Sequence, residues 1–84
     1  MPALVKIINL SSRFDPAIVL VNGKILIMNL KMYDSTSMLQ ISSGIQKISV
    51  TTKQYRESLK MTYDFKFSNN ASKSYFIYIY DDKI

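Results

Sequence analysis

Few side chains in this chain of 84 residues could carry out chemistry. The sequence contains no cysteine and no histidine, which excludes disulfides, zinc fingers, thiol nucleophiles, imidazole metal sites and the Ser-His-Asp triad. The remaining carboxylates are scattered along the chain: Asp15, Asp34, Glu57, Asp64, Asp81 and Asp82. We therefore predict that the protein is not an enzyme and that it holds no cofactor.

Two local groups resemble parts of functional sites. Asp81 and Asp82 could form one side of a calcium site, but a hard cation needs several oxygens that converge from rigid positions. We therefore predict no metal site here and interpret residues 81–84 as a frayed, solubilising tail. The second group consists of serines without a histidine or lysine base beside them, which indicates turn residues rather than nucleophiles. These are Ser11, Ser12, Ser35, Ser37, Ser42 and Ser43.

The charge is basic, with 11 Lys and Arg against 6 Asp and Glu, a net charge of +5 and a pI near 9.6. Such a balance is compatible with nucleic acid, anionic lipid or acidic glycan as a partner. No basic residues are adjacent, so we interpret them as solvated outward faces. Aromatic residues between lysines can stack on the bases of a single strand. However, Tyr63, Phe65 and Phe67 share the apolar side of an alternating strand, which favours the core.

The elements that would position any site are β-strands. Apolar and polar residues alternate with a period of two, and the Asn22-Gly23 pair predicts a type I′ hairpin turn. With 48% apolar residues, the chain is expected to fold as one domain over residues 1–84, with its core in 3–80. We predict an all-β, seven-stranded antiparallel β-sandwich, with a small closed barrel as the alternative. The expected strands are 3–9, 17–22, 24–30, 36–41, 45–52, 57–67 and 74–80.

Several motifs resemble the bacterial family called domain of unknown function 4397. They are the run Val5-Lys6-Ile7-Ile8-Asn9-Leu10-Ser11, Asp15-Pro16-Ala17, Val19-Leu20-Val21-Asn22-Gly23-Lys24, Asn29-Leu30 and the stretch Met38–Gly44. The resemblance covers about residues 3–80. It implies an immunoglobulin-like or transthyretin-like sandwich of the kind found in surface proteins, and it implies no catalytic residues. The sequence departs from the family at Gln46, where an aromatic residue is common; a core glutamine would need partners for its amide.

Two strands have apolar residues on the side that should face solvent. Ile18 and Leu20 occupy these positions on the second strand, and Phe76, Tyr78 and Tyr80 occupy them on the last. Exposed apolar patches on a small domain mark interfaces, and terminal strands are natural sheet edges. We predict that these five residues form the interaction surface, on one sheet or on two, for a homodimer or another protein partner.

The setting is harder to infer. No signal peptide is recognised, and the longest apolar stretches, 17–21 and 75–80, are too short to span a membrane. We expect a cytoplasmic protein as written, or a cell-surface one if the chain is part of a longer protein. The predicted function is a non-enzymatic, self-associating binding or structural module of a bacterial surface or envelope. The alternative is a small cytoplasmic nucleic-acid-binding β-protein; nucleic acid is the less favoured partner.

Overall fold

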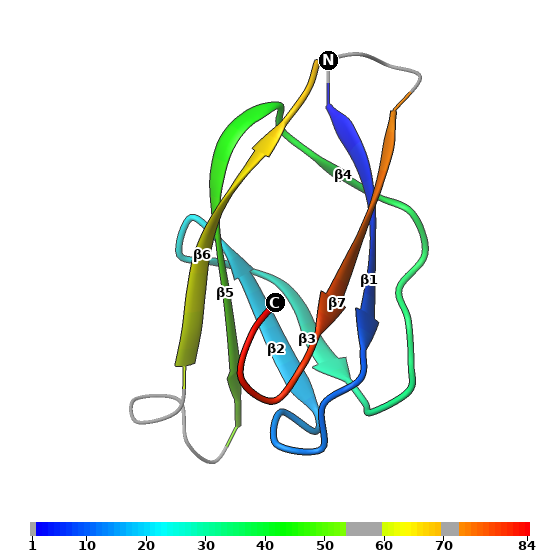
Figure 1. Cartoon of the computed structure of the whole chain (residues 1–84), viewed down its shortest axis with the longest axis vertical. Helices are drawn as coiled ribbons and strands as arrows, with labels where there is room; N and C mark the ends of the chain where they lie inside the picture. The colour runs from blue at the N-terminus through cyan, green and yellow to red at the C-terminus, as the bar shows by residue number, and fades with distance from the viewer. Residues whose placement is uncertain (1, 54–59, 70–72) are drawn as a thin grey trace.

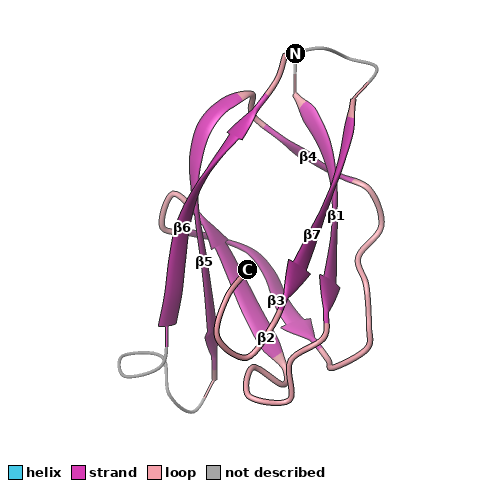
Figure 2. Cartoon of the chain, viewed as in Figure 1, coloured by secondary structure: helices cyan, strands magenta, loops and turns pink. Residues whose placement is uncertain are grey.

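The computed structural model describes residues 2–53, 60–69 and 73–84, and every regular element in them is a β-strand (Figures 1 and 2). The all-β class is therefore confirmed. The strands are β1 (Ala3–Asn9), β2 (Ala17–Val21), β3 (Lys24–Leu30), β4 (Leu39–Ile41), β5 (Gly44–Thr52), β6 (Lys60–Phe67) and β7 (Ser74–Ile79). Residues 57–59, which were predicted to begin the sixth strand, lie outside the described residues.

The strands form two sheets, as expected for a sandwich-like fold. One has three strands in the order β4-β1-β7, and the other has four in the order β3-β2-β5-β6. Figure 1 shows β5 and β6 on the left and β1 and β7 on the right. β6 and β7 are each the last strand of their sheet among the described residues.

The prediction that all strands are antiparallel is wrong for one pair. β1 and β7 run parallel, in a register from Leu4 opposite Ser74 to Asn9 opposite Ile79. Only strands joined by a tight hairpin are obliged to be antiparallel. β1 and β7 come from opposite ends of the chain, so no hairpin determines their relative direction.

The turn between β2 and β3 agrees with its sequence. Asn22 and Gly23 both have positive φ, 51° and 83°, as a type I′ turn requires. The Asn22 side chain also accepts a hydrogen bond from the Lys47 N–H at 2.9 Å and donates one to the Gln46 Oε1. The Gln46 amide in turn donates to the Ser43 carbonyl at 3.0 Å, so this buried glutamine has the partners that its position demands.

Alternate side chains of both sheets meet in one core. On β1, for example, Val5 and Ile7 are fully buried. Asn9 of the same strand is also fully buried, and its side-chain amide donates hydrogen bonds to the carbonyls of Phe14 at 2.7 Å and Leu30 at 2.8 Å. The buried apolar residues that form the core are Ala3, Val5, Ile7, Phe14, Ala17, Val19, Leu30, Ile41, Ile48, Val50, Phe67, Ile77 and Ile79.

Burial falls off along the core side of β6. Phe67 is 3% exposed, Phe65 is partly buried and Tyr63 is 39% exposed. The expectation that Phe65 is nearly fully buried is therefore wrong, although the strand register is right. β6 is the outer strand of its sheet, and its core side is covered unevenly: Tyr75 of β7 packs against Phe67, and Met61 packs against the core, whereas Tyr63 stays near the surface.

We expect Phe67→Ala to lower the free energy of unfolding by about 3–5 kcal/mol, the usual cost of removing a buried phenylalanine side chain. Phe65→Ala should cost less because solvent already reaches that ring, and Lys66→Ala should be nearly silent. Urea denaturation of the three variants measures these differences. An equal cost for Phe65→Ala and Phe67→Ala would contradict the burial gradient along β6.

Candidate interaction surface

The five residues predicted to form an interaction surface lie on different sheets. Ile18 and Leu20 belong to β2 in the four-stranded sheet, whereas Phe76 and Tyr78 belong to β7 and Tyr80 follows it in the three-stranded sheet. The structure does not bring them together.

The prediction of an exposed patch on β2 is wrong. Ile18 is only 3% exposed, and Leu20 is half-buried. β2 is an inner strand between β3 and β5, so neighbouring strands flank its outward side chains; Ile18 lies opposite Thr51 and Leu20 opposite Ser49. Ile18 is not available to a partner.

The outward side of β7 is exposed as predicted. Phe76 is 57% exposed, Tyr78 43% and Tyr80 39%, and we call these three residues the aromatic stripe. Their alternation with Tyr75, Ile77 and Ile79 turns every second side chain away from the core.

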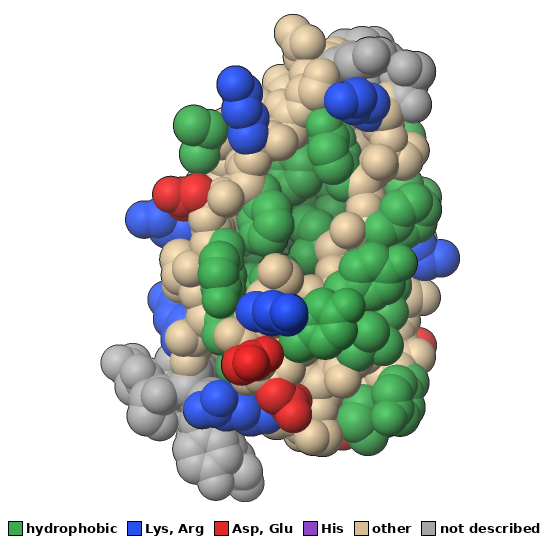
Figure 3. Space-filling model, viewed as in Figure 1, with side chains coloured by type: hydrophobic (Ala, Val, Ile, Leu, Met, Phe, Trp, Pro, Cys, Tyr) green, Lys and Arg blue, Asp and Glu red, His purple; other side chains and the backbone are tan. Residues whose placement is uncertain are grey.

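A groove runs between β6 and β7, and the three residues of the aromatic stripe form part of its lining. Phe65 and Phe67 line it from β6, and Tyr75 and Ile77 line it from β7. Its volume is about 390 Å³, and Ile84 lines it as well. Figure 3 shows hydrophobic side chains gathered around a hollow on this face of the molecule. Sequence analysis missed this β6–β7 groove, because strand patterns do not show which strands end up at the two facing edges.

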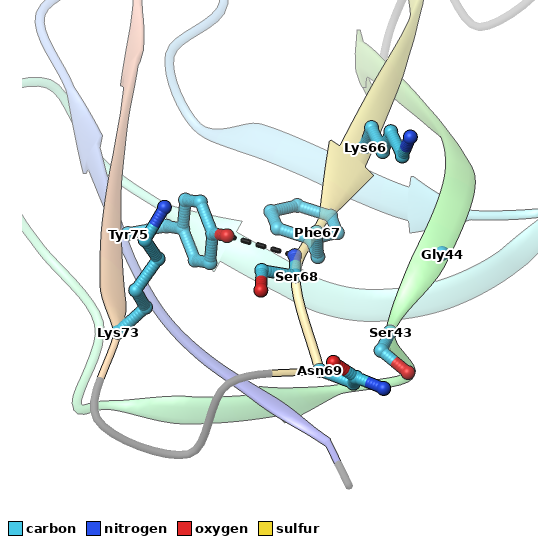
Figure 4. Close-up of a pocket in the computed structure, with 8 residues that line it drawn as sticks. All are labelled: Ser43, Gly44, Lys66, Phe67, Ser68, Asn69, Lys73 and Tyr75. Atoms are coloured by element: carbon cyan, nitrogen blue, oxygen red, sulfur yellow. Dashed lines mark hydrogen bonds between the residues drawn. The ribbon is translucent and has the colours of Figure 1, made fainter.

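A second cavity of about 620 Å³ adjoins the groove and shares Lys66, Phe67 and Tyr75 with it. Figure 4 shows its lining, in which the Tyr75 hydroxyl accepts a hydrogen bond from the Ser68 N–H at 2.8 Å. The rings of Phe67 and Tyr75 meet edge to face, with centroids 5.0 Å apart. These two contacts join the sheets at this end, and Lys66 and Lys73 make the end positively charged.

The tail after β7 is tied down, so its expected fraying is wrong. Asp81 accepts hydrogen bonds from the Ser11 hydroxyl at 2.6 Å and from the Arg13 N–H at 3.1 Å. The Tyr80 N–H donates to the Lys83 carbonyl at 2.8 Å, and the Lys83 ammonium lies 5.5 Å from the centre of the Tyr80 ring. The tail thus folds back toward the groove, and Figure 1 shows the C-terminus between β6 and β7.

The same contacts change the acidity of Asp81. The hydrogen bond from Ser11, followed by that from the Arg13 backbone, lowers the pKa of the Asp81 carboxyl below its ordinary value of 3.8. A depressed pKa in the folded state means that ionised Asp81 stabilises the fold above the unfolded-state pKa. This stabilisation is lost as the pH falls through the folded-state pKa.

We therefore expect the wild type to be more stable than Asp81→Asn at pH 6, and the difference to shrink as the pH falls below about 4. Thermal unfolding of both proteins between pH 2 and 6 measures it. A difference that stays constant over this range would contradict the role of the Asp81 charge.

The described residues offer little for chemistry. They contain no group of three or more His, Cys, Asp or Glu side chains that could hold a metal ion. The lysines are dispersed over both sheets, for example Lys6 on β1, Lys24 on β3 and Lys47 on β5, where Lys47 lies opposite Asp64 of β6. In the part of the chain that the structure describes, no helix could span a membrane.

The aromatic stripe and the β6–β7 groove together form an exposed apolar surface. No family model and no curated protein matches this chain in sequence comparisons.

Proposed function

We propose that the protein is a non-enzymatic β-sandwich module that acts by self-association through the face at β7. The observation that carries this proposal is the exposure of Phe76, Tyr78 and Tyr80 on a strand at the edge of its sheet. These three residues also help to line the β6–β7 groove, which extends the apolar surface to Phe65 and Phe67 of β6.

The size of the aromatic stripe supports an interface. An aromatic side chain can bury about 150–250 Å², so the exposed fractions of the three rings correspond to roughly 200–350 Å² of accessible surface. Apolar patches of a few hundred Å² on a small protein often mark binding sites. Tyrosine is also suited to interfaces because its rigid ring packs while its hydroxyl stays hydrogen-bonded at the rim.

The setting of this module rests on the sequence resemblance alone. Membership of the domain of unknown function 4397 family, with an immunoglobulin-like or transthyretin-like topology, would place it in a bacterial surface or envelope protein as an adhesion or spacer domain. The two-sheet, all-β fold is compatible with that role. An immunoglobulin-like or transthyretin-like topology would have to include the parallel pairing of β1 with β7.

Sedimentation at micromolar concentrations tests the proposal. We expect the wild type to self-associate, and we expect Phe76→Lys and Tyr78→Lys to shift it to monomer because each places a charge inside the apolar contact. The association should persist in high salt, since burial of apolar surface, unlike contact with phosphates, does not depend on counterion release.

Ile45→Lys is the matched control. Ile45 is 69% exposed on β5 and does not line the groove, so this substitution adds the same charge elsewhere and should leave the association unchanged. A strictly monomeric wild type would refute self-association. Tight, salt-sensitive binding to oligonucleotides by such a monomer would instead favour the nucleic-acid alternative.

A further inference from the structure

The tail, residues 81–84, crosses from one sheet to the other at one end of the β6–β7 groove. It leaves β7 after Tyr80, and the hydroxyl of Tyr63 on β6 donates to the Asp82 carbonyl at 3.5 Å. Ile84 then lines the groove and packs against the hydrophobic core. The tail therefore closes this end of the groove with its own residues.

Asp81 fastens the tail to the loop after β1. Its carboxylate accepts the hydroxyl of the buried Ser11 at 2.6 Å and the Arg13 N–H at 3.1 Å, and the Arg13 guanidinium donates to the Asp81 carbonyl at 3.3 Å. The Ser11 oxygen also accepts the N–H groups of Arg13 and Phe14, both at 3.0 Å. The anchor is thus a rigid part of the loop, and Asp81 is the residue of the tail that grips it.

The rest of the tail is held by fewer contacts. Asp82 and Lys83 are exposed, and Ile84 is half-buried. Within the part of the chain that the structure describes, the hydrogen bonds of 82–84 are those that join Asp82 to Tyr63 and Lys83 to Tyr80. Segments with little buried surface and few hydrogen bonds open locally at low cost in free energy. The contacts of Asp81 therefore decide whether the tail stays over the groove.

The closed tail changes the surface that a partner would meet. The Lys83 carbonyl accepts the Tyr80 N–H at 2.8 Å, and the Lys83 ammonium lies 5.5 Å from the centre of the Tyr80 ring. A partner that covers this ring has to bury the ammonium as well, and removing a charge from water is costly. Ile84 also occupies apolar surface of the groove. The tail and an apolar partner therefore compete for the same end of the groove.

We propose that residues 81–84 form an autoinhibitory strap, which in its closed position keeps an apolar partner from one end of the β6–β7 groove and which opens when the contacts of Asp81 are lost. That this partner is a second copy rests on the function proposed above, whereas closure of the groove by the strap does not. A protein whose open state is only partly populated binds with an affinity reduced by that fraction. Release of the strap should therefore strengthen binding at the groove.

Two substitutions release the strap through different contacts. Asp81→Ala removes the acceptor of the Ser11 and Arg13 hydrogen bonds, and Ile84→Ser removes the apolar contact with the groove. Asp82→Ala is the matched control, because it removes the same charge from the next residue and keeps the backbone carbonyl that Tyr63 contacts. The Asp82 side chain itself makes no hydrogen bond or ion pair with a described residue.

Binding of anilinonaphthalene sulfonate, an apolar dye, measures access to the groove at protein concentrations too low for association. We expect its fluorescence with Asp81→Ala and with Ile84→Ser to rise about threefold or more over the wild type, following the open fraction. Asp82→Ala should stay near the wild type, which shows that the anionic dye does not respond merely to the lost charge.

Amide hydrogen exchange separates release of the strap from unfolding. In both release variants the Tyr80 N–H should exchange faster, because its acceptor is the Lys83 carbonyl. The Leu10 N–H, which is bonded to the Ile79 carbonyl at 2.9 Å, should keep its wild-type rate. Dye binding and Tyr80 exchange that are the same in Asp81→Ala as in Asp82→Ala, or a Leu10 amide that speeds up equally with that of Tyr80, would overturn the strap.

Sedimentation of the same variants then tests the link to self-association. Tighter association of Asp81→Ala and Ile84→Ser than of the wild type and Asp82→Ala would support autoinhibition. An open groove with association no tighter than that of the wild type would overturn autoinhibition and leave self-association standing. An open groove in variants that stay monomeric, as the wild type does, would refute self-association and support the strap as a cover of the groove.

Discussion

The parallel pairing of β1 with β7 determines which part of this protein is left open. It places the first strand in the middle of its sheet and the last strand at the edge, opposite β6. The hydrogen-bonding groups of β7 are then satisfied on one side only, and its outward side chains are aromatic. The free edge, the aromatic stripe and the groove are thus consequences of one strand pairing.

The groove is held open and bounded by a small number of contacts. At one end, Tyr75 bridges to β6 through the Ser68 N–H and the Phe67 ring. At the other, Asp81 fastens the tail to the loop after β1, and the tail brings Ile84 to the groove. The loop is itself fixed by Asn9, whose side chain bonds Phe14 and Leu30. Polar contacts, of which those of Asn9 are buried and those of Asp81 lie at the surface, therefore support an apolar surface.

The fold class was predictable from the sequence because strand alternation and the Asn22-Gly23 turn depend on neighbouring residues. The same alternation placed Phe76, Tyr78 and Tyr80 together on one side of the last strand, and the structure shows that this side is exposed. The burial of Ile18 was not predictable, since alternation indicates the face on which a side chain lies but not whether its strand is inside the sheet or at its edge. The direction of β7 and the position of the tail depend on contacts between residues about 70 positions apart, such as Ser11 with Asp81, and local patterns carry no information on these.

The central claim is that two copies meet at the aromatic stripe of β7. Isotope-filtered NMR on a mixture of labelled and unlabelled protein observes contacts between copies directly, without a substitution. We predict intermolecular contacts at the rings of Phe76 and Tyr78. Intermolecular contacts confined to β2 and β3, or none at concentrations up to the millimolar range, would contradict this account.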